Sequence, residues 1–171
     1  MKDSLYRQDK QRYVEKMPKF QRYFRKASEA DWGLTRMLYR VLFKLFKEIN
    51  HVEINLGTQI GGGLYIGHPF CITINPDAKI GSNVNLHRGV VIGQENRGKR
   101  KGAPIIGDEV WVGINATVVG KIVIGDDVLI APNSYVNCNV PSHSIVIGNP
   151  CRIIHKDNAT ENYINHQCII E

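Results

Sequence analysis

Aliphatic residues recur along most of the chain with a step of six positions. They form three uninterrupted runs, which are Ile54, Ile60 and Ile66; Ile74, Ile80, Leu86 and Ile92; and Ile106, Val112, Val118, Ile124, Ile130 and Val136. A period of six fits neither an α-helix nor the period-two alternation of a β-sandwich, but it fits a short strand and a turn that repeat. Three such units closing a coil of about 18 residues predict a parallel β-helix with the aliphatic side chains stacked inside.

Two interruptions of this rhythm are the candidate sites of function. The step of eight after Ile66 shows that two residues are inserted just after His68. The step of fourteen after Ile92 shows that residues 94–104, which are rich in Lys and Arg, leave the coil as a loop. Because packing decides the inside of every coil, we expect the chemistry of such a repeat protein on its insertions and outward positions.

The chain before the repeat has a helical pattern. An apolar stripe at helical spacing comprises Leu34, Leu38, Val41, Leu42, Leu45 and Ile49, and the basic residues Arg36, Arg40, Lys44 and Lys47 line another side. Such a helix can lie on a membrane surface. More often its stripe packs on its own chain or on a neighbouring subunit, so we do not expect peripheral membrane contact.

These patterns divide the chain into three parts. We expect an α-helical N-terminal segment over residues 1–51, a parallel β-helix domain over 52–154 that includes the loop 94–104, and a polar C-terminal tail over 155–171. The first part carries 13 Lys and Arg against 6 Asp and Glu, whereas the rest carries 9 against 10. The basic character of the chain, whose net charge is +6, therefore belongs to its N-terminal segment.

The composition narrows the class of protein further. No apolar run approaches the roughly 18 residues that a membrane span needs, and the charged N-terminus lacks the apolar region of a signal peptide. The four cysteines form no C-x-x-C pair, which favours reduced thiols in a cytoplasmic protein. The six histidines include no closely spaced pair of the kind found in zinc sites, so we expect no metal.

The sequence resembles a known family over about residues 52–154. The hexapeptide rhythm, the basic loop and the ending "IVIGNPCRII" are similar to the left-handed β-helix acyltransferases. The stretch "VEINLGTQIGGGLYIGHPFCITINPDAKIG" resembles the serine O-acetyltransferases and their relatives in polysaccharide biosynthesis. The resemblance implies a mainly β fold, a left-handed parallel β-helix. It also implies acetyl-CoA as cosubstrate, and a homotrimer with active sites between neighbouring subunits.

Acetyl transfer from a thioester to a hydroxyl needs a base that takes the hydroxyl proton, and His68 is our candidate. The repeat register turns it outward, the insertion gives it room, and it matches the catalytic histidine of the family. Glu53 matches the carboxylate that pairs with that histidine in serine acetyltransferases, where it is an aspartate. A carboxylate can select the imidazole tautomer and stabilise the imidazolium. The spacing of 15 residues is close to one coil but leaves a solvated Glu53 as the alternative.

Further residues are assigned to substrate binding. His87 lies one coil beyond His68 on the same face, where it binds the acceptor, replaces the base or fills a subunit interface. The resemblance puts the pantetheine arm of coenzyme A near Gly113, Ile114, Ala131 and Pro132, with Arg152 or the basic residues of loop 94–104 at its phosphates.

The sequence also departs from the serine acetyltransferases. Gly67 stands where they have a serine-binding aspartate, and Gly102 and Ala103 stand where they have an Arg-His pair. A carboxylate of their helical domain that contacts serine has no clear counterpart here. These losses remove charged partners of a small zwitterion.

Three alternatives to a serine O-acetyltransferase therefore stay open. A sugar O-acetyltransferase of capsule or exopolysaccharide biosynthesis would not need the missing groups. A non-catalytic β-helix binding protein would dock through the basic helix, although the intact His68 insertion speaks against it. A nucleic-acid binder is disfavoured because the loop lacks interleaved aromatic residues and the β-helix itself is slightly acidic.

Overall fold

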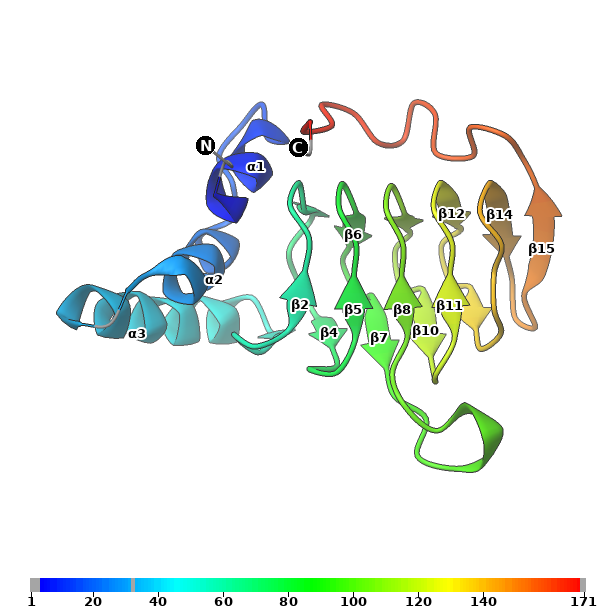
Figure 1. Cartoon of the computed structure of the whole chain (residues 1–171), viewed down its shortest axis with the longest axis horizontal. Helices are drawn as coiled ribbons and strands as arrows, with labels where there is room; N and C mark the ends of the chain where they lie inside the picture. The colour runs from blue at the N-terminus through cyan, green and yellow to red at the C-terminus, as the bar shows by residue number, and fades with distance from the viewer. Residues whose placement is uncertain (1–3, 32, 170–171) are drawn as a thin grey trace.

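The strands of the computed structural model form three parallel sheets that wind into one β-helix, with three helices at its N-terminal end (Figure 1). The structure describes residues 4–31 and 33–169. From β1 to β13, consecutive strands along the chain fall in sheets A, B and C in turn, and each pairs in parallel with a strand about one coil away. This arrangement confirms the predicted β-helix of hexapeptide repeats with a short helical segment before it.

The strands are short, mostly two or three residues long. Sheet A holds β1 (Val52–Glu53), β4 (Ile72–Ile74), β7 (Val91–Gly93), β10 (Thr117–Val119) and β13 (Tyr135–Val136). Sheet B holds β2 (Gln59–Ile60), β5 (Lys79–Ile80), β8 (Ile105–Ile106) and β11 (Val123–Ile124). Sheet C holds β3 (Tyr65–Gly67), β6 (Asn85–His87), β9 (Trp111–Val112), β12 (Val128–Ile130), β14 (Ser144–Ile147) and β15 (Arg152–His155).

The predicted aliphatic positions form the core, as the six-residue period requires. All thirteen of them are buried, with exposed fractions between 0% and 6%. Register pairs such as Ile74 with Ile92 and Ile92 with Val118 stack each residue on its counterpart in the next coil. This stacking along the axis removes apolar surface from water at about 25 cal/mol per Å², so the long-range contacts of the repeat stabilise strands too short to be stable alone.

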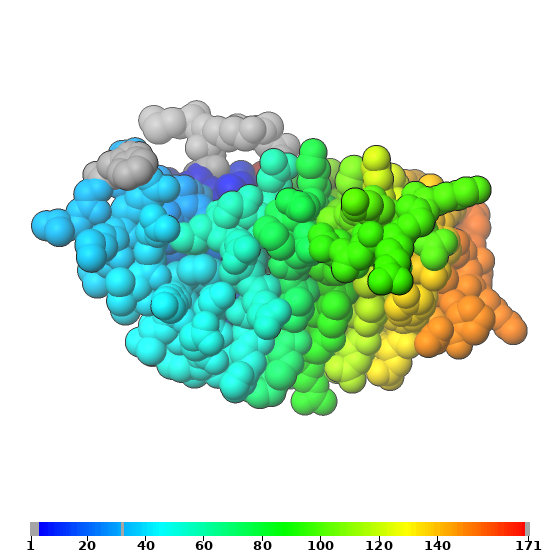
Figure 2. Space-filling model, turned by 90° about the horizontal axis from the view of Figure 1, so that it is seen from below, coloured from blue at the N-terminus to red at the C-terminus, as the bar shows by residue number. Residues whose placement is uncertain are grey.

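Both predicted interruptions lie at corners between sheets. Residues 68–71 form the corner that leads from β3 in sheet C to β4 in sheet A. The loop 94–104 leaves the coil between β7 and β8 and contains the short 3₁₀ helix η1 (Gly98–Arg100). It projects from the coils in Figure 1 and forms a raised green ridge in Figure 2. Neither insertion disturbs the stacked core.

The helices are α1 (Leu5–Gln11), α2 (Lys19–Glu29) and α3 (Leu34–Ile49). Helix α3 packs on α2 through aromatic residues, with Phe43 buried against Phe24 at a ring distance of 5.7 Å. The predicted apolar stripe turns the other way: Leu34, Leu38, Val41, Leu45 and Ile49 are 52% to 87% exposed. The stripe therefore does not pack on its own chain, because the aromatic side of α3 is the side that the core uses. Among the described helices none is long and apolar enough to cross a membrane.

A buried polar cluster joins the helices to the first coil. The Arg25 guanidinium lies 2.7 Å from the Asp9 carboxylate, and both side chains are at most 2% exposed. Arg25 also donates to the carbonyl oxygen of Ile60 at 2.8 Å, and Asp9 accepts from the backbone N–H of Leu64 at 3.0 Å and from the Gln21 amide at 2.9 Å. The pair thus satisfies backbone groups of the β-helix that the helices cover.

The C-terminal part of the chain is packed rather than a free polar tail. β15 pairs antiparallel with β14, and residues 156–169 then run back along the coils toward α1 (Figure 1). Asp127 accepts hydrogen bonds from the N–H groups of Ala159 and Thr160, and Arg12 donates to the carbonyl oxygen of Asn165 at 3.0 Å. Composition alone does not show this path, because its anchors are single polar contacts far apart in the sequence.

We predict that Asp9→Ala lowers the free energy of unfolding by about 3–5 kcal/mol, because it leaves the Arg25 charge buried without its partner. Urea denaturation followed by circular dichroism measures the change. Lys10→Ala, at an exposed position on the same helix, is the matched control and should leave the midpoint unchanged. Equal midpoints for the two variants would contradict the role given to the ion pair.

Candidate active site

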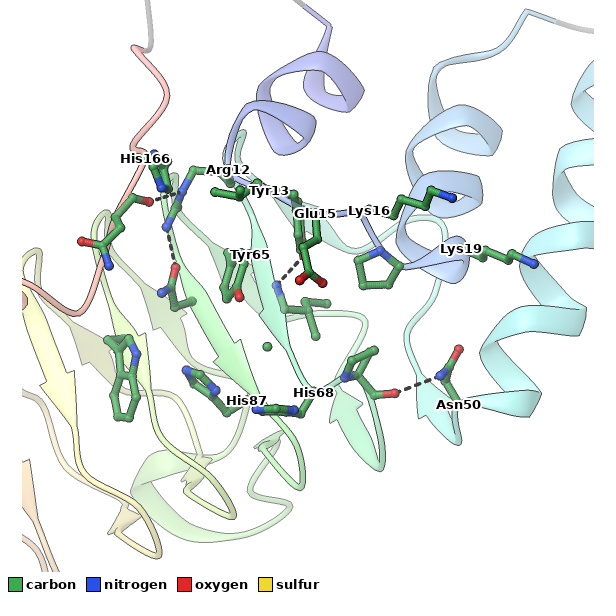
Figure 3. A pocket seen from close by; sticks show the side chains of 18 of the residues that line it. Arg12, Tyr13, Glu15, Lys16, Lys19, Asn50, Tyr65, His68, His87 and His166 are labelled. Atoms are coloured by element: carbon green, nitrogen blue, oxygen red, sulfur yellow. Dashed lines mark hydrogen bonds between the residues drawn. The ribbon is translucent and has the colours of Figure 1, made fainter.

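A cavity of about 900 Å³ lies where the helices, the first coils and the returning C-terminal segment meet. Residues 12–19, between α1 and α2, form one wall, and the end of α3 forms another. The floor is the edge of sheet C with the corner after β3, and Tyr163, Asn165 and His166 close the far side. Figure 3 shows His68 and His87 side by side at its base. The cavity therefore brings together parts of the chain about 150 residues apart.

His68 opens the corner that the two-residue insertion creates. It follows β3 directly, is exposed, and has a backbone φ of 58°, in the left-handed region. That conformation is uncommon for a residue other than glycine and persists only where the surroundings hold it. Asn50, after α3, supports the corner by donating from its amide to the carbonyl oxygen of Pro69 at 3.0 Å. The ring is thus presented to the cavity by a restrained turn.

His87 is the second imidazole at the base of the cavity. It lies in β6 directly beside Gly67 in the register of sheet C, and its ring packs on Trp111 at 4.7 Å. Burial, with a smaller contribution from the charge of His68, lowers the pKa of His87 below its ordinary value of 6.5. Its Nε2 atom is buried and has no hydrogen-bond partner among the described residues. His87 is therefore a neutral ring with an unused polar atom at the cavity.

Gly67 has no room for a side chain because of His87. A Cβ atom at position 67 would lie 2.9 Å from both Cε1 and Nδ1 of the His87 ring. Carbon atoms do not approach so closely, so any larger residue here would have to displace the imidazole. This gives a physical reason why glycine stands where the resemblance predicts an aspartate: the His87 ring occupies that side chain's space.

Glu53 lies apart from this pair. It belongs to β1 in sheet A, pairs in register with Thr73, and lines a separate hollow beside His51. Within residues 4–31 and 33–169 no hydrogen bond or ion pair joins Glu53 to His68. The pairing of the two residues stays a prediction.

The residues assigned to coenzyme A lie on the same edge of the β-helix as His68. Gly113, Ile114, Ala131 and Pro132 follow β9 and β12, where the chain again turns from sheet C to sheet A. We call this the C–A edge, formed by residues 68–71, 88–90, 113–116 and 131–134. Gly113 is tightly packed against the next coil, since a Cβ there would lie 2.7 Å from the backbone nitrogen of Pro132.

Arg152 and the basic loop lie farther from the two histidines. Arg152 is exposed on β15, at the end of the β-helix opposite the helices (Figure 1). Arg97, Lys99, Arg100 and Lys101 are exposed on the loop that follows β7. Either set is placed to meet only the distal part of a long ligand. Among the described residues no group of three or more His, Cys, Asp or Glu side chains could hold a metal ion.

The cavity also contains residues that sequence reasoning missed. Glu15 is the one carboxylate among the residues that line it, and Lys16 and Lys19 lie on the same wall. Trp111 and Tyr163 add aromatic surface near His87, with their rings 5.2 Å apart. The segment from 12 to 19 and the C-terminal residues carry no repeat or spacing signal, so the sequence offered nothing that connects them to His68.

Comparisons with known proteins agree with this architecture. Residues 103–138 match the family model described as bacterial transferase hexapeptide (six repeats). The chain is 37% identical over 118 residues to the serine acetyltransferase of Helicobacter pylori, covering 69% of each chain. It is 36% identical over 121 residues to that of Staphylococcus xylosus, covering 71% of this chain and 56% of the relative.

Solved structures give the same result. The serine acetyltransferase of Brucella abortus superposes with a TM-score of 0.74 at 25% identity, covering 91% of this chain and 70% of that one. The soybean serine acetyltransferase complexed with serine gives 0.67 at 28% identity, covering 79% and 56%. The chain thus spans just over half to about 70% of the length of these relatives.

We predict that His87 titrates below pH 6.5, because burial disfavours its charged form. In the window between this lowered pKa and 6.5 the unfolded chain binds the extra proton, so stability falls as the pH drops through that window. NMR titration of the imidazole signals measures the midpoint. Trp111→Ala opens one side of the ring and should move the midpoint back up. A midpoint at or above 6.5 in the unchanged protein would contradict the burial argument.

Proposed function

The chain belongs to the serine acetyltransferase family, and on that premise we propose that it transfers an acetyl group from acetyl-CoA to the hydroxyl of L-serine. The observation that carries the proposal is the His68 corner, in which an exposed imidazole opens into the cavity at the head of the C–A edge. The identity of 37% to a serine acetyltransferase over most of the chain favours serine over a sugar acceptor and over a non-catalytic role.

In the proposed mechanism His68 acts as general base. Its neutral imidazole accepts the serine hydroxyl proton as the oxygen attacks the thioester carbonyl carbon. The carbon–sulfur bond then breaks, and the imidazolium returns the proton to the departing thiolate of coenzyme A. Glu53 is the proposed carboxylate that orients the imidazole and stabilises its charged form. The chain holds both substrates close together, which removes the entropic cost of their encounter from the chemical step.

The cosubstrate is proposed to lie along the C–A edge. Gly113 and Ile114, with Ala131 and Pro132 on the next coil, would bind the pantetheine arm through backbone groups. The close packing of Gly113 against Pro132 supports this, since position 113 has no room for a side chain that would extend into the edge. Arg152, with the loop cations, would meet the phosphates as charge-assisted donors. A homotrimer would place a neighbouring β-helix along this groove.

Serine is a zwitterion, and the cavity offers both signs of charge. Glu15 is proposed to meet the ammonium group, and Lys16 and Lys19 supply positive charge for the carboxylate. These residues from the connection between α1 and α2 would take over the recognition that the family assigns to the positions occupied here by Gly67, Gly102 and Ala103. A site built on different residues can thus accept the same substrate.

We predict that the purified protein releases free thiol from acetyl-CoA in the presence of L-serine, and that His68→Ala lowers kcat by about 10²–10⁴-fold. A thiol-reactive dye measures the rate. Glu53→Gln should cause a smaller loss, because it leaves the base in place. His155→Ala, at an exposed histidine far along the β-helix, is the matched control. A His68→Ala variant with the full rate would remove the mechanism. The proposal would be wrong if the protein neither bound coenzyme A nor released thiol with any acceptor from a panel of serine, homoserine, sugars and nucleotide sugars.

We further predict that Glu15→Gln raises the KM for L-serine by about tenfold while the KM for acetyl-CoA stays within twofold, since it removes a charged partner of the ammonium group. Initial rates at varied serine concentration give the value. The KM for an uncharged hydroxyl acceptor should change little on the same substitution. An unaltered serine KM would show that Glu15 takes no part in recognition.

A further inference from the structure

The C-terminal segment 158–168 is anchored along the β-helix at three points. Asp127 accepts from the N–H of Thr160 at 2.9 Å and from its hydroxyl at 2.7 Å. Asn85 donates from its amide to the carbonyl oxygen of Tyr163 at 3.1 Å. Asn83 binds Cys168 through both its amide nitrogen and its carbonyl oxygen, at 3.1 and 3.0 Å.

Asn83 and Asn85 belong to the coil of β6, and Asp127 precedes β12, two coils farther on, so the anchors set the path of the segment along the axis. Every fourth side chain from Thr160 onward is buried on the β-helix, with Thr160 4%, Ile164 7% and Cys168 4% exposed. The side chain of Tyr163 is directed elsewhere and is 50% exposed. The backbone of Tyr163 is therefore held at a defined place while its ring remains available at the cavity that it lines.

The ring of Tyr163 begins a chain of aromatic contacts that ends at His87, whose strand neighbour Gly67 precedes His68. Tyr163 packs edge-on against Trp111 at 5.2 Å, and Trp111 packs against His87 at 4.7 Å. On its other side the His87 ring lies against Gly67, next to His68. The His87 ring is thus held between sheet C and an aromatic pair, one member of which comes from the C-terminal segment.

In this arrangement the His87 ring keeps one nitrogen without a hydrogen-bond partner in the described part of the chain. Nε2 of His87 is buried and unbonded among the described residues, although a buried imidazole nitrogen normally has a partner. The His87 side chain lines the cavity that His68 also lines. An acceptor that brings its hydroxyl to His68 would place a neighbouring polar group within reach of His87.

We propose that the C-terminal segment is a wall of the acceptor site, and that Tyr163 is a positioning residue that holds Trp111 and His87 so that Nε2 of His87 hydrogen-bonds the acceptor. The inference rests on the proposed function, because the acceptor is the substrate whose hydroxyl His68 deprotonates. It assigns a binding role to a part of the chain outside the β-helix repeat.

The test compares substitutions of Tyr163 in the full-length protein. Tyr163→Ala removes the ring contact and should raise the KM for L-serine by about three- to tenfold, with the KM for acetyl-CoA and kcat within twofold of the unchanged protein. Tyr163→Phe keeps the aromatic contact and should restore most of the serine KM. Glu161→Ala, at an exposed position on the same segment, is the control for a change that leaves the wall intact.

The outcomes separate this inference from the proposed function. Lack of thiol release by the unchanged protein would defeat the proposed function itself. Normal turnover with an unaltered serine KM in Tyr163→Ala would overturn the positioning role alone. Equal effects on both KM values, or a loss of the thermal midpoint that matches the loss of activity, would show a merely structural contact and would overturn it too. A selective rise in the serine KM that Tyr163→Phe reverses supports it.

Discussion

The stacking of one aliphatic side chain per strand on its counterpart in the next coil is the constraint on which the rest of this protein depends. Pairs such as Ile92 with Val118 fill an interior with no space for polar groups, because an unpaired polar group there would lose its hydration without compensation. The interior side chains of the coils are therefore much alike. Everything that distinguishes this protein from other hexapeptide repeats lies at corners, on outward positions and in the segments added at the two ends.

The candidate site follows from that constraint. A two-residue insertion is accommodated at a corner without disturbing the stack, and it turns His68 outward at the head of the C–A edge. The register of sheet C then sets His87 beside Gly67, so that the imidazole fills the space a larger residue 67 would need. The glycine at position 67 and the position of the His87 ring one coil away therefore depend on each other.

The N-terminal helices and the C-terminal segment supply the remaining walls of the cavity at His68. The buried pair of Asp9 and Arg25 binds the helices to the first coil, and this brings the connection that holds Glu15 over the His68 corner. The C-terminal segment returns along the coils and brings Tyr163 to the same cavity. Both additions attach through buried polar contacts to backbone groups and also through buried apolar side chains such as Phe24 and Ile164.

The sequence by itself determined the β-helix, its thirteen stacked core positions and its two interruptions, because a repeat enforces the same local packing at every turn, and it singled out His68 as the candidate base. Only the tertiary structure decided that Glu15 and Tyr163 share a cavity with His68, that the apolar stripe of α3 faces outward, and that the His87 ring closes the space at Gly67. These facts depend on contacts between segments up to about 150 residues apart. Each is made by a few specific polar or aromatic groups that leave no periodic trace along the chain.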